Sequence, residues 1–150
     1  LTPSDAGGAS PRTMAAAFAM GAEAVQLGTR MVSAAESPVH QNWKDAIINA
    51  AETDTVFLNQ FSKPALRALR TQKTTRLERE LTPDYKGPPV MAEMGNALDL
   101  YFGGDMEASI ALSGQVCGRI DSVKPVAQIL REMEAEFHQV TRGLYERYET

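Results

Sequence analysis

Apolar residues follow a helical spacing in several segments of this chain and form short uninterrupted runs in others. The first segment, "SPRTMAAAFAMG", carries the signals of a complete helix. Ser10 is suited to cap its start, Pro11 to its first turn, and Gly21 to the left-handed conformation that ends a helix. The alanine and methionine residues between them favour helix. The pattern therefore predicts a helix of about ten residues.

The run "AEAVQLG", residues 22–28, is apolar and ends at a glycine, which is typical of a buried parallel strand. Gly7 and Gly8 precede the helix, while Gly28 and Thr29 end the run. If a strand precedes Gly7, both loops would lie at the same carboxyl edge of a parallel sheet. Neighbouring strands are ~4.8 Å apart, so amides of the two loops could bind one anion. Spacing alone leaves open that these glycines are only turn residues.

The middle of the chain is predicted to combine helices with short extended segments. Helical spacing predicts a helix over residues 38–51, and "DTVFL", residues 54–58, is typical of a short strand. Residues 63–80 carry six Lys and Arg side chains, but glutamates intervene and the net charge is −4, which favours a solvated face over a nucleic-acid site. The Pro- and Gly-rich residues 82–90 predict a loop.

Two apolar stripes follow that loop. Met91, Met94, Leu98 and Tyr101 have helical spacing, which predicts a helix whose stripe belongs to the core. From Ser122 onwards, apolar residues recur at steps of three and four, so a long amphipathic packing helix is expected towards the C-terminus.

Composition restricts the class of protein. The 150 residues are 43% hydrophobic and 23% charged, as in soluble globular proteins, and no apolar run approaches the ~18 residues of a membrane helix. The single cysteine, Cys117, excludes an internal disulfide and a multi-cysteine metal site, and we expect it to be a small buried side chain. We predict no metal site, no nucleic-acid or membrane partner, and a cytoplasmic location.

Several of these segments together resemble one family. The stretch from "GGASPRTMAAAFAMGAEAVQLGTR" to "NWKDAI", with "ETDTV", "KPALRALR" and "SGQVCGRI", resembles the flavin-dependent nitronate monooxygenase (2-nitropropane dioxygenase) family, from about Ala6 to Glu136. That family shares a TIM barrel with flavin-dependent enoyl-acyl-carrier-protein reductases. The resemblance implies an α/β fold, the C-terminal portion of a (β/α)₈ barrel with an appended, mainly helical segment. Residues 1–58 would form the last barrel units, 59–112 the appended segment, and 113–150 the return to the barrel and the C-terminal helix.

The resemblance also implies an FMN site. It implies that backbone groups of two turns hold the FMN phosphate, with Gly7 and Gly8 in the first and Gln26, Leu27, Gly28 and Thr29 in the second. It places residues 113–115, "SGQ", where the chain returns beside the flavin.

Part of the family pattern is missing from this chain. "LTPSDA", before the glycine pair, does not have the composition of a barrel strand. The family's catalytic histidine comes from an earlier strand, so neither His40, at a helix entry, nor His138, in the last helix, inherits its role. We expect His40 to be a surface or capping residue and His138 to be exposed, and the catalytic residue is unknown. A complementary polypeptide is expected to supply the rest of the barrel and to cover the stripe of the last helix.

The implied activity is FMN-dependent oxidation of alkyl nitronates, with a small-molecule substrate. Two alternatives stay open. One is FMN-dependent reduction of an enoyl thioester by NAD(P)H. The other is a non-catalytic subunit that completes the barrel of another chain.

Overall fold

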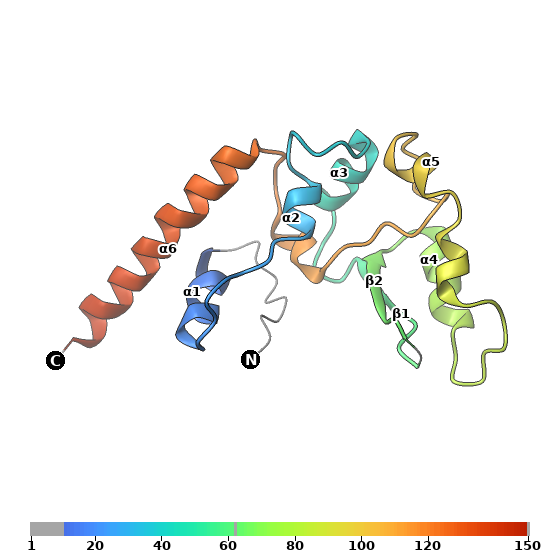
Figure 1. The fold of residues 1–150 in the computed structure, drawn as a ribbon, viewed down its shortest axis with the longest axis horizontal. Helices are drawn as coiled ribbons and strands as arrows, with labels where there is room; N and C mark the ends of the chain where they lie inside the picture. Colours follow the sequence, from blue (N-terminus) through green and yellow to red (C-terminus); the bar gives the residue numbers. More distant parts are fainter. Residues whose placement is uncertain (1–10, 62, 150) are drawn as a thin grey trace.

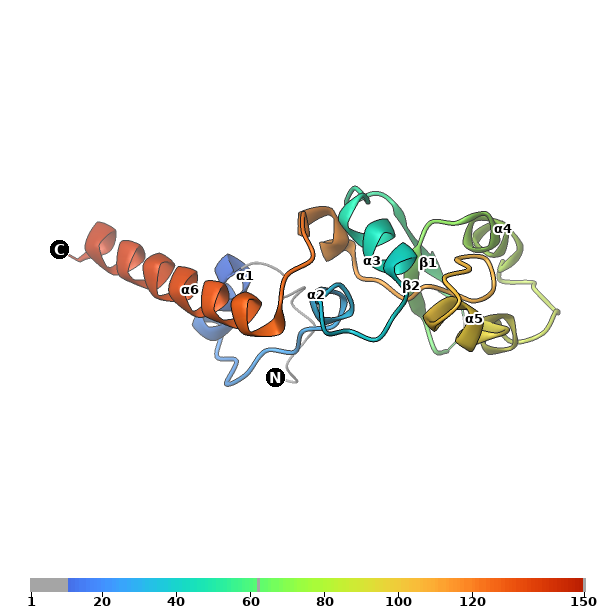
Figure 2. The same ribbon diagram turned by 90° about the horizontal axis from the view of Figure 1, so that it is seen from above.

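The chain is elongated, as a computed structural model describes it over residues 11–61 and 63–149. Helices α1 and α6 lie at one end, and α4 and α5 lie at the other (Figures 1 and 2). In chain order, the elements are α1 (Pro11–Ala19), α2 (Thr29–Val32), α3 (Gln41–Ile48), β1 (Thr55–Leu58), β2 (Leu66–Leu69), α4 (Gln72–Glu80), η1 (Val90–Met94), α5 (Ala97–Tyr101), η2 (Gln115–Arg119) and α6 (Val126–Tyr148), where η marks a 3₁₀ helix.

The first predicted helix is confirmed as α1. Gly21 has a φ of +92°, the left-handed conformation that its position predicted. Helix α1 packs on α6, where the rings of Phe18 and Phe137 meet edge to face with centroids 5.5 Å apart. The predicted cap Ser10 and the glycine pair Gly7 and Gly8 lie outside the described residues.

The predicted parallel strand over residues 22–28 is wrong for this structure. These residues have an irregular backbone that forms no ladder with any described strand. An apolar run becomes a strand only where a neighbour pairs with its backbone, and the described part of the chain places none beside it. Leu27 instead packs with α2 and α6, against a small cluster of Ala34, Ile129 and Met133.

The sheet of the structure is a β-hairpin. The strand predicted from "DTVFL" is confirmed as β1, which pairs antiparallel with β2 in the register Thr55↔Leu69. Residue Leu112 extends the sheet through a bridge to Ala68. This hairpin crosses the boundary between residues 58 and 59 at which we expected an appended segment to begin, so that division stays a prediction.

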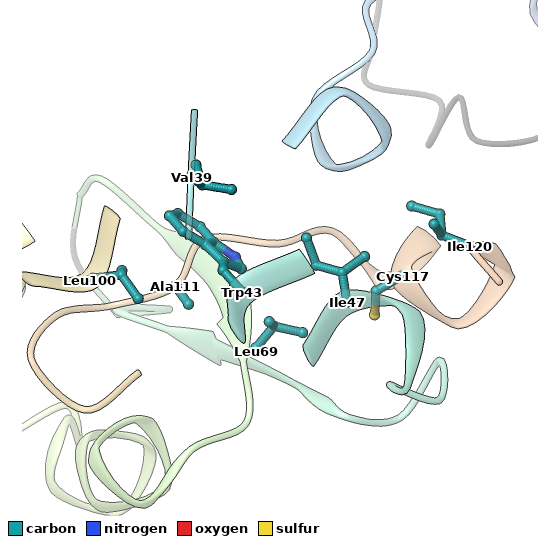
Figure 3. Packing of buried hydrophobic residues seen from close by; sticks show 8 residues of the cluster. All are labelled: Val39, Trp43, Ile47, Leu69, Leu100, Ala111, Cys117 and Ile120. Carbon is teal, nitrogen blue, oxygen red and sulfur yellow. The ribbon is translucent and has the colours of Figure 1, made fainter. Parts of the chain in front are cut away.

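Helices cover both faces of the hairpin. Leu69 of β2 points to the α3 side, where Trp43 and Ile47 of α3 form a buried cluster with six other residues, all labelled in Figure 3. Ala68, the preceding residue, belongs to a second cluster with Leu77 of α4. Successive strand residues thus face opposite layers, as the pleat requires.

Two helices begin later than predicted. Helix α3 starts at Gln41 because His40, with an extended ψ of 148°, caps it: His40 Nδ1 accepts a hydrogen bond from the Asn42 amide at 3.1 Å. The capping role expected for His40 is therefore confirmed. Helix α6 starts at Val126 because Pro125 disfavours helical geometry in the residue before it, Lys124.

Only part of the methionine stripe contributes to the core: Met94 packs against the cluster that contains Leu77, and the ring of Tyr101 meets that of Trp43. Gly95, with a φ of +55°, breaks the predicted helix into η1 and α5. The exposed fractions of Met91 and Leu98 are 50% and 66%, whereas Val90 and Leu100 are buried. The loop predicted over residues 82–90 is confirmed up to the start of η1.

The basic segment forms β2 and α4. Two of its six cations pair with carboxylates: Arg70 with Glu78 at 2.9 Å, and Arg76 with Glu80 at 2.7 Å and Glu93 at 3.1 Å. These partly exposed pairs agree with the solvated face that the interspersed glutamates predicted.

Candidate functional site

The turn of residues 26–29 leads into α2 and is partly exposed to solvent. Gln26 and Gly28 are exposed, Leu27 is half-buried, and Thr29 is buried. The side chain of Leu27 is used in packing, so this residue can offer only its backbone to a ligand.

Two backbone amides of this turn have no hydrogen-bond acceptor among the described residues. The Gly28 carbonyl accepts the amides of Met31 and Val32, which starts α2. Among the described residues, none accepts a hydrogen bond from the amides of Gly28 or Thr29. A Cβ built on Gly28 would meet nothing within 4 Å, so the space beside this backbone is open. The Gly28 amide, which has open space beside it, and the neighbouring Thr29 amide are donors of the kind that bind an anion.

The chain returns to this turn 85 residues later. The amide of Gly114 donates a hydrogen bond to Thr29 Oγ1 at 2.9 Å. The Gly114 carbonyl accepts the amide of Cys117 at 3.2 Å, which begins η2. The segment "SGQ" therefore lies beside the turn of residues 26–29, and its position beside a flavin stays a prediction.

The side chain of Arg30, the residue after the turn, holds α2 in place through hydrogen bonds. Its guanidinium is buried, and Nη1 donates to the Ser122 carbonyl at 2.7 Å and to Ser33 Oγ at 3.4 Å. Burial lowers the pKa of Arg30, opposed by the charges of Asp121 and Glu132. This arginine ties α2 to the segment before α6, a role for which the sequence carries no local signal.

A cavity of ≈ 310 Å³ lies beside η2. Gln115 lines it, together with Thr13 of α1, Val116, Glu52 and Arg119, and the last two form an ion pair at 2.8 Å. Gln115 of the "SGQ" segment thus faces an open space between η2 and α1.

The remaining candidates lie outside this turn. His40 is occupied in capping α3, and His138 is exposed on α6, as predicted. Cys117 is fully buried as expected, and burial raises the pKa of its thiol. In residues 11–61 and 63–149, no group of three or more His, Cys, Asp or Glu side chains could hold a metal ion, and no helix is long and apolar enough to cross a membrane.

The comparison with known families settles the relationship. Residues 5–136 match the family model described as nitronate monooxygenase. The chain belongs to the nitronate monooxygenase family. It is 30% identical over 134 residues to probable nitronate monooxygenases of Staphylococcus aureus strains JH9 and N315, covering 86% of this chain and 36% of theirs.

Solved structures agree with this assignment. FabK from Thermotoga maritima is 37% identical with a TM-score of 0.83, over 94% of this chain and 45% of that one. A mutant of the same FabK is 35% identical with a TM-score of 0.78, over 43% of its length. The likeness to FabK, which has a TIM barrel, supports the expectation that this chain forms part of such a barrel. The chain spans a little over a third of the curated relatives it matches.

Proposed function

We propose that this chain supplies the FMN-phosphate-binding part of an enzyme that oxidises alkyl nitronates. The observation that carries the proposal is the turn at Gly28 and Thr29, whose two amides have no acceptor among the described residues and which has open space within 4 Å of a Cβ built on Gly28. Membership of the nitronate monooxygenase family, whose members are flavin-dependent, supports the choice of FMN.

The donor set fits a phosphate. The amides of Gly28 and Thr29 and the hydroxyl of Thr29 would hold the phosphate, with Gln26 and Leu27 shaping the turn. Hydrogen bonds from such donors to a charged group are stronger than those to neutral groups. The glycine pair Gly7–Gly8, outside the described residues, is proposed as the other side of this site.

Bound FMN supplies an electron acceptor for a carbanion-like nitronate and a route for those electrons to oxygen. The part of the chain described here binds and orients the cofactor. The proposal gives no catalytic role to His40, which caps α3, or to His138, which is exposed on α6. We therefore assign the proton-transferring residue to the rest of the barrel.

The rest of the barrel, on a longer form of this chain or on a second polypeptide, is proposed to cover α1 and α6. Large apolar side chains stay exposed on α6 and just after α1 although the two helices are in contact. They are Met20, which follows α1, and Leu130, Leu144, Tyr145 and Tyr148 of α6. A patch of this kind on a soluble protein marks a contact surface.

The covering partner can be tested by mass. Light scattering of the 150-residue chain alone is expected to show self-association or unfolding, because the stripe of α6 is uncovered. Addition of a polypeptide with the preceding half of the barrel should give a defined complex. A stable, folded monomer of 16.3 kDa that binds no such polypeptide would contradict the proposal.

The activity itself can be tested with the assembled protein. We expect a yellow complex with flavin absorbance that consumes oxygen when given an alkyl nitronate. Reduction of an enoyl thioester by NAD(P)H, without nitronate oxidation, would favour the second candidate, which the likeness to FabK supports. A colourless complex that binds no FMN would favour the third candidate function, a non-catalytic subunit that completes a barrel.

A further inference from the structure

The segment between α1 and α2 (Figure 1) carries a run of backbone groups that have no partner in the described part of the chain. No described residue donates a hydrogen bond to the backbone of residues 23–27 or accepts one from it. Three of these five residues, "EAVQL", are apolar, which favours burial of the segment. Buried peptide groups need hydrogen-bond partners, so this segment requires a neighbour that supplies them.

The side chains of the same segment alternate between two environments. Val25 and Leu27 are half-buried, whereas Ala24 and Gln26 are exposed. Leu27 packs against a cluster that α6 supplies with two residues and that Met14 of α1 also contacts. An alternation with a period of two is the pattern of a strand that has helices on one face and is open on the other.

These two features indicate the kind of partner that fits the segment. In a (β/α)₈ barrel each strand pairs with a parallel strand at either edge, and the helices form an outer ring. Residues 23–27 have a helix before them, a helix after them, helices on one face, and unpaired backbone at both edges. The chain covers only 45% of FabK, to which it is similar, so the neighbouring strands would belong to the rest of the barrel.

We propose that residues 23–27 are a docking strand, to which the rest of the barrel binds by adding one parallel strand at each edge. Main-chain hydrogen bonds then join the two parts, as in other cases of strand addition. Val25 and Leu27 stay against the helices, while Ala24 and Gln26 face the barrel interior. The inference rests on the proposed function for the existence of the partner, but it is independent of FMN.

Amide hydrogen exchange in the assembled, flavin-free protein tests the docking strand. We expect the amides of residues 23–27 to exchange at least about a hundredfold more slowly than unpaired amides of the same sequence. In a strand, the amides of residues 23, 25 and 27 point to one edge and those of 24 and 26 to the other. Slow exchange of one set alone would indicate a single neighbouring strand, for example from a second copy, and would overturn the proposal. Fast exchange of both sets would overturn it as well.

Proline at position 24 tests the same pairing through stability. Ala24→Pro removes an amide that has no acceptor among the described residues, so the part of the fold described here does not depend on it. In the assembled protein the change deletes a bond to the neighbouring strand, and the urea midpoint should fall by about 1 M. Ala24→Ser, the matched control, keeps the amide and should unfold close to the wild type. Equal midpoints for wild type and Ala24→Pro would contradict the docking strand.

A titration with FMN separates this inference from the proposed function. If residues 23–27 exchange slowly and the assembled protein binds no FMN, the FMN assignment is overturned and the docking strand is supported. If FMN binds and residues 23–27 exchange fast, the docking strand is overturned and the FMN assignment is supported. Both measurements use the wild-type protein, so neither depends on the folding of a variant.

Discussion

Valine at position 28 is expected to weaken FMN binding by more than about a hundredfold, because its side chain would fill the space in front of two amide donors. A hydrogen bond to a charged group contributes about 1.5–3 kcal/mol, so loss of both exceeds a hundredfold in affinity. The flavin-free fold should survive, since a Cβ at Gly28 meets nothing within 4 Å. Fluorescence titration with FMN, beside a thermal melt of flavin-free protein, measures the two effects separately.

Graded variants at the same turn provide the controls. Gly28→Ala adds only a methyl group and should weaken FMN binding less than Gly28→Val. Thr29→Ala removes one donor and should weaken binding by roughly ten- to a hundredfold. Unchanged affinity in all three variants would move the phosphate site elsewhere and leave Gly28 as an ordinary turn residue.

Elements held by local signals were predictable from the sequence. Helix α1 has its own start and stop residues, and strand β1 its own apolar pattern. The run over residues 22–28 shows the limit of such reasoning, because a parallel strand depends on neighbours as much as on its own residues. The stripe at Met91 and Leu98 fails for a related reason: a positive φ at Gly95 divides it, and periodicity does not report backbone conformation.

Some residues of the candidate site could also be predicted from the sequence, and others could not. Gly28 and Thr29 stood out because glycine beside a hydroxyl residue at the end of an apolar run suits a phosphate turn. The bond from Gly114 to Thr29 spans 85 residues, and the burial of Arg30 depends on the segment before α6. Neither follows from sequence periodicity, since both depend on how distant segments pack.

Alanine at position 118 is expected to destabilise the fold by about 1–3 kcal/mol, the usual cost of forcing extra volume into a packed region. Its Cβ would lie 2.3 Å from the backbone nitrogen of Glu52, in the loop between α3 and β1. A backbone atom cannot rotate away, so η2 would have to move away from that loop. That movement would disturb Cys117, which is fully buried in the cluster around α3. Urea unfolding of Gly118→Ala in the assembled protein, monitored by circular dichroism, measures the loss.

Another glycine in the chain gives a matched control for this substitution. Gly143 lies inside α6, where a Cβ meets nothing within 4 Å, so Gly143→Ala should stabilise the helix by about 0.5–1 kcal/mol. The same added methyl group thus has opposite effects at two sites, because only position 118 is pressed against backbone. If Gly118→Ala unfolds at the wild-type urea concentration while Gly143→Ala is stabilised as expected, the close contact between η2 and Glu52 does not exist in solution.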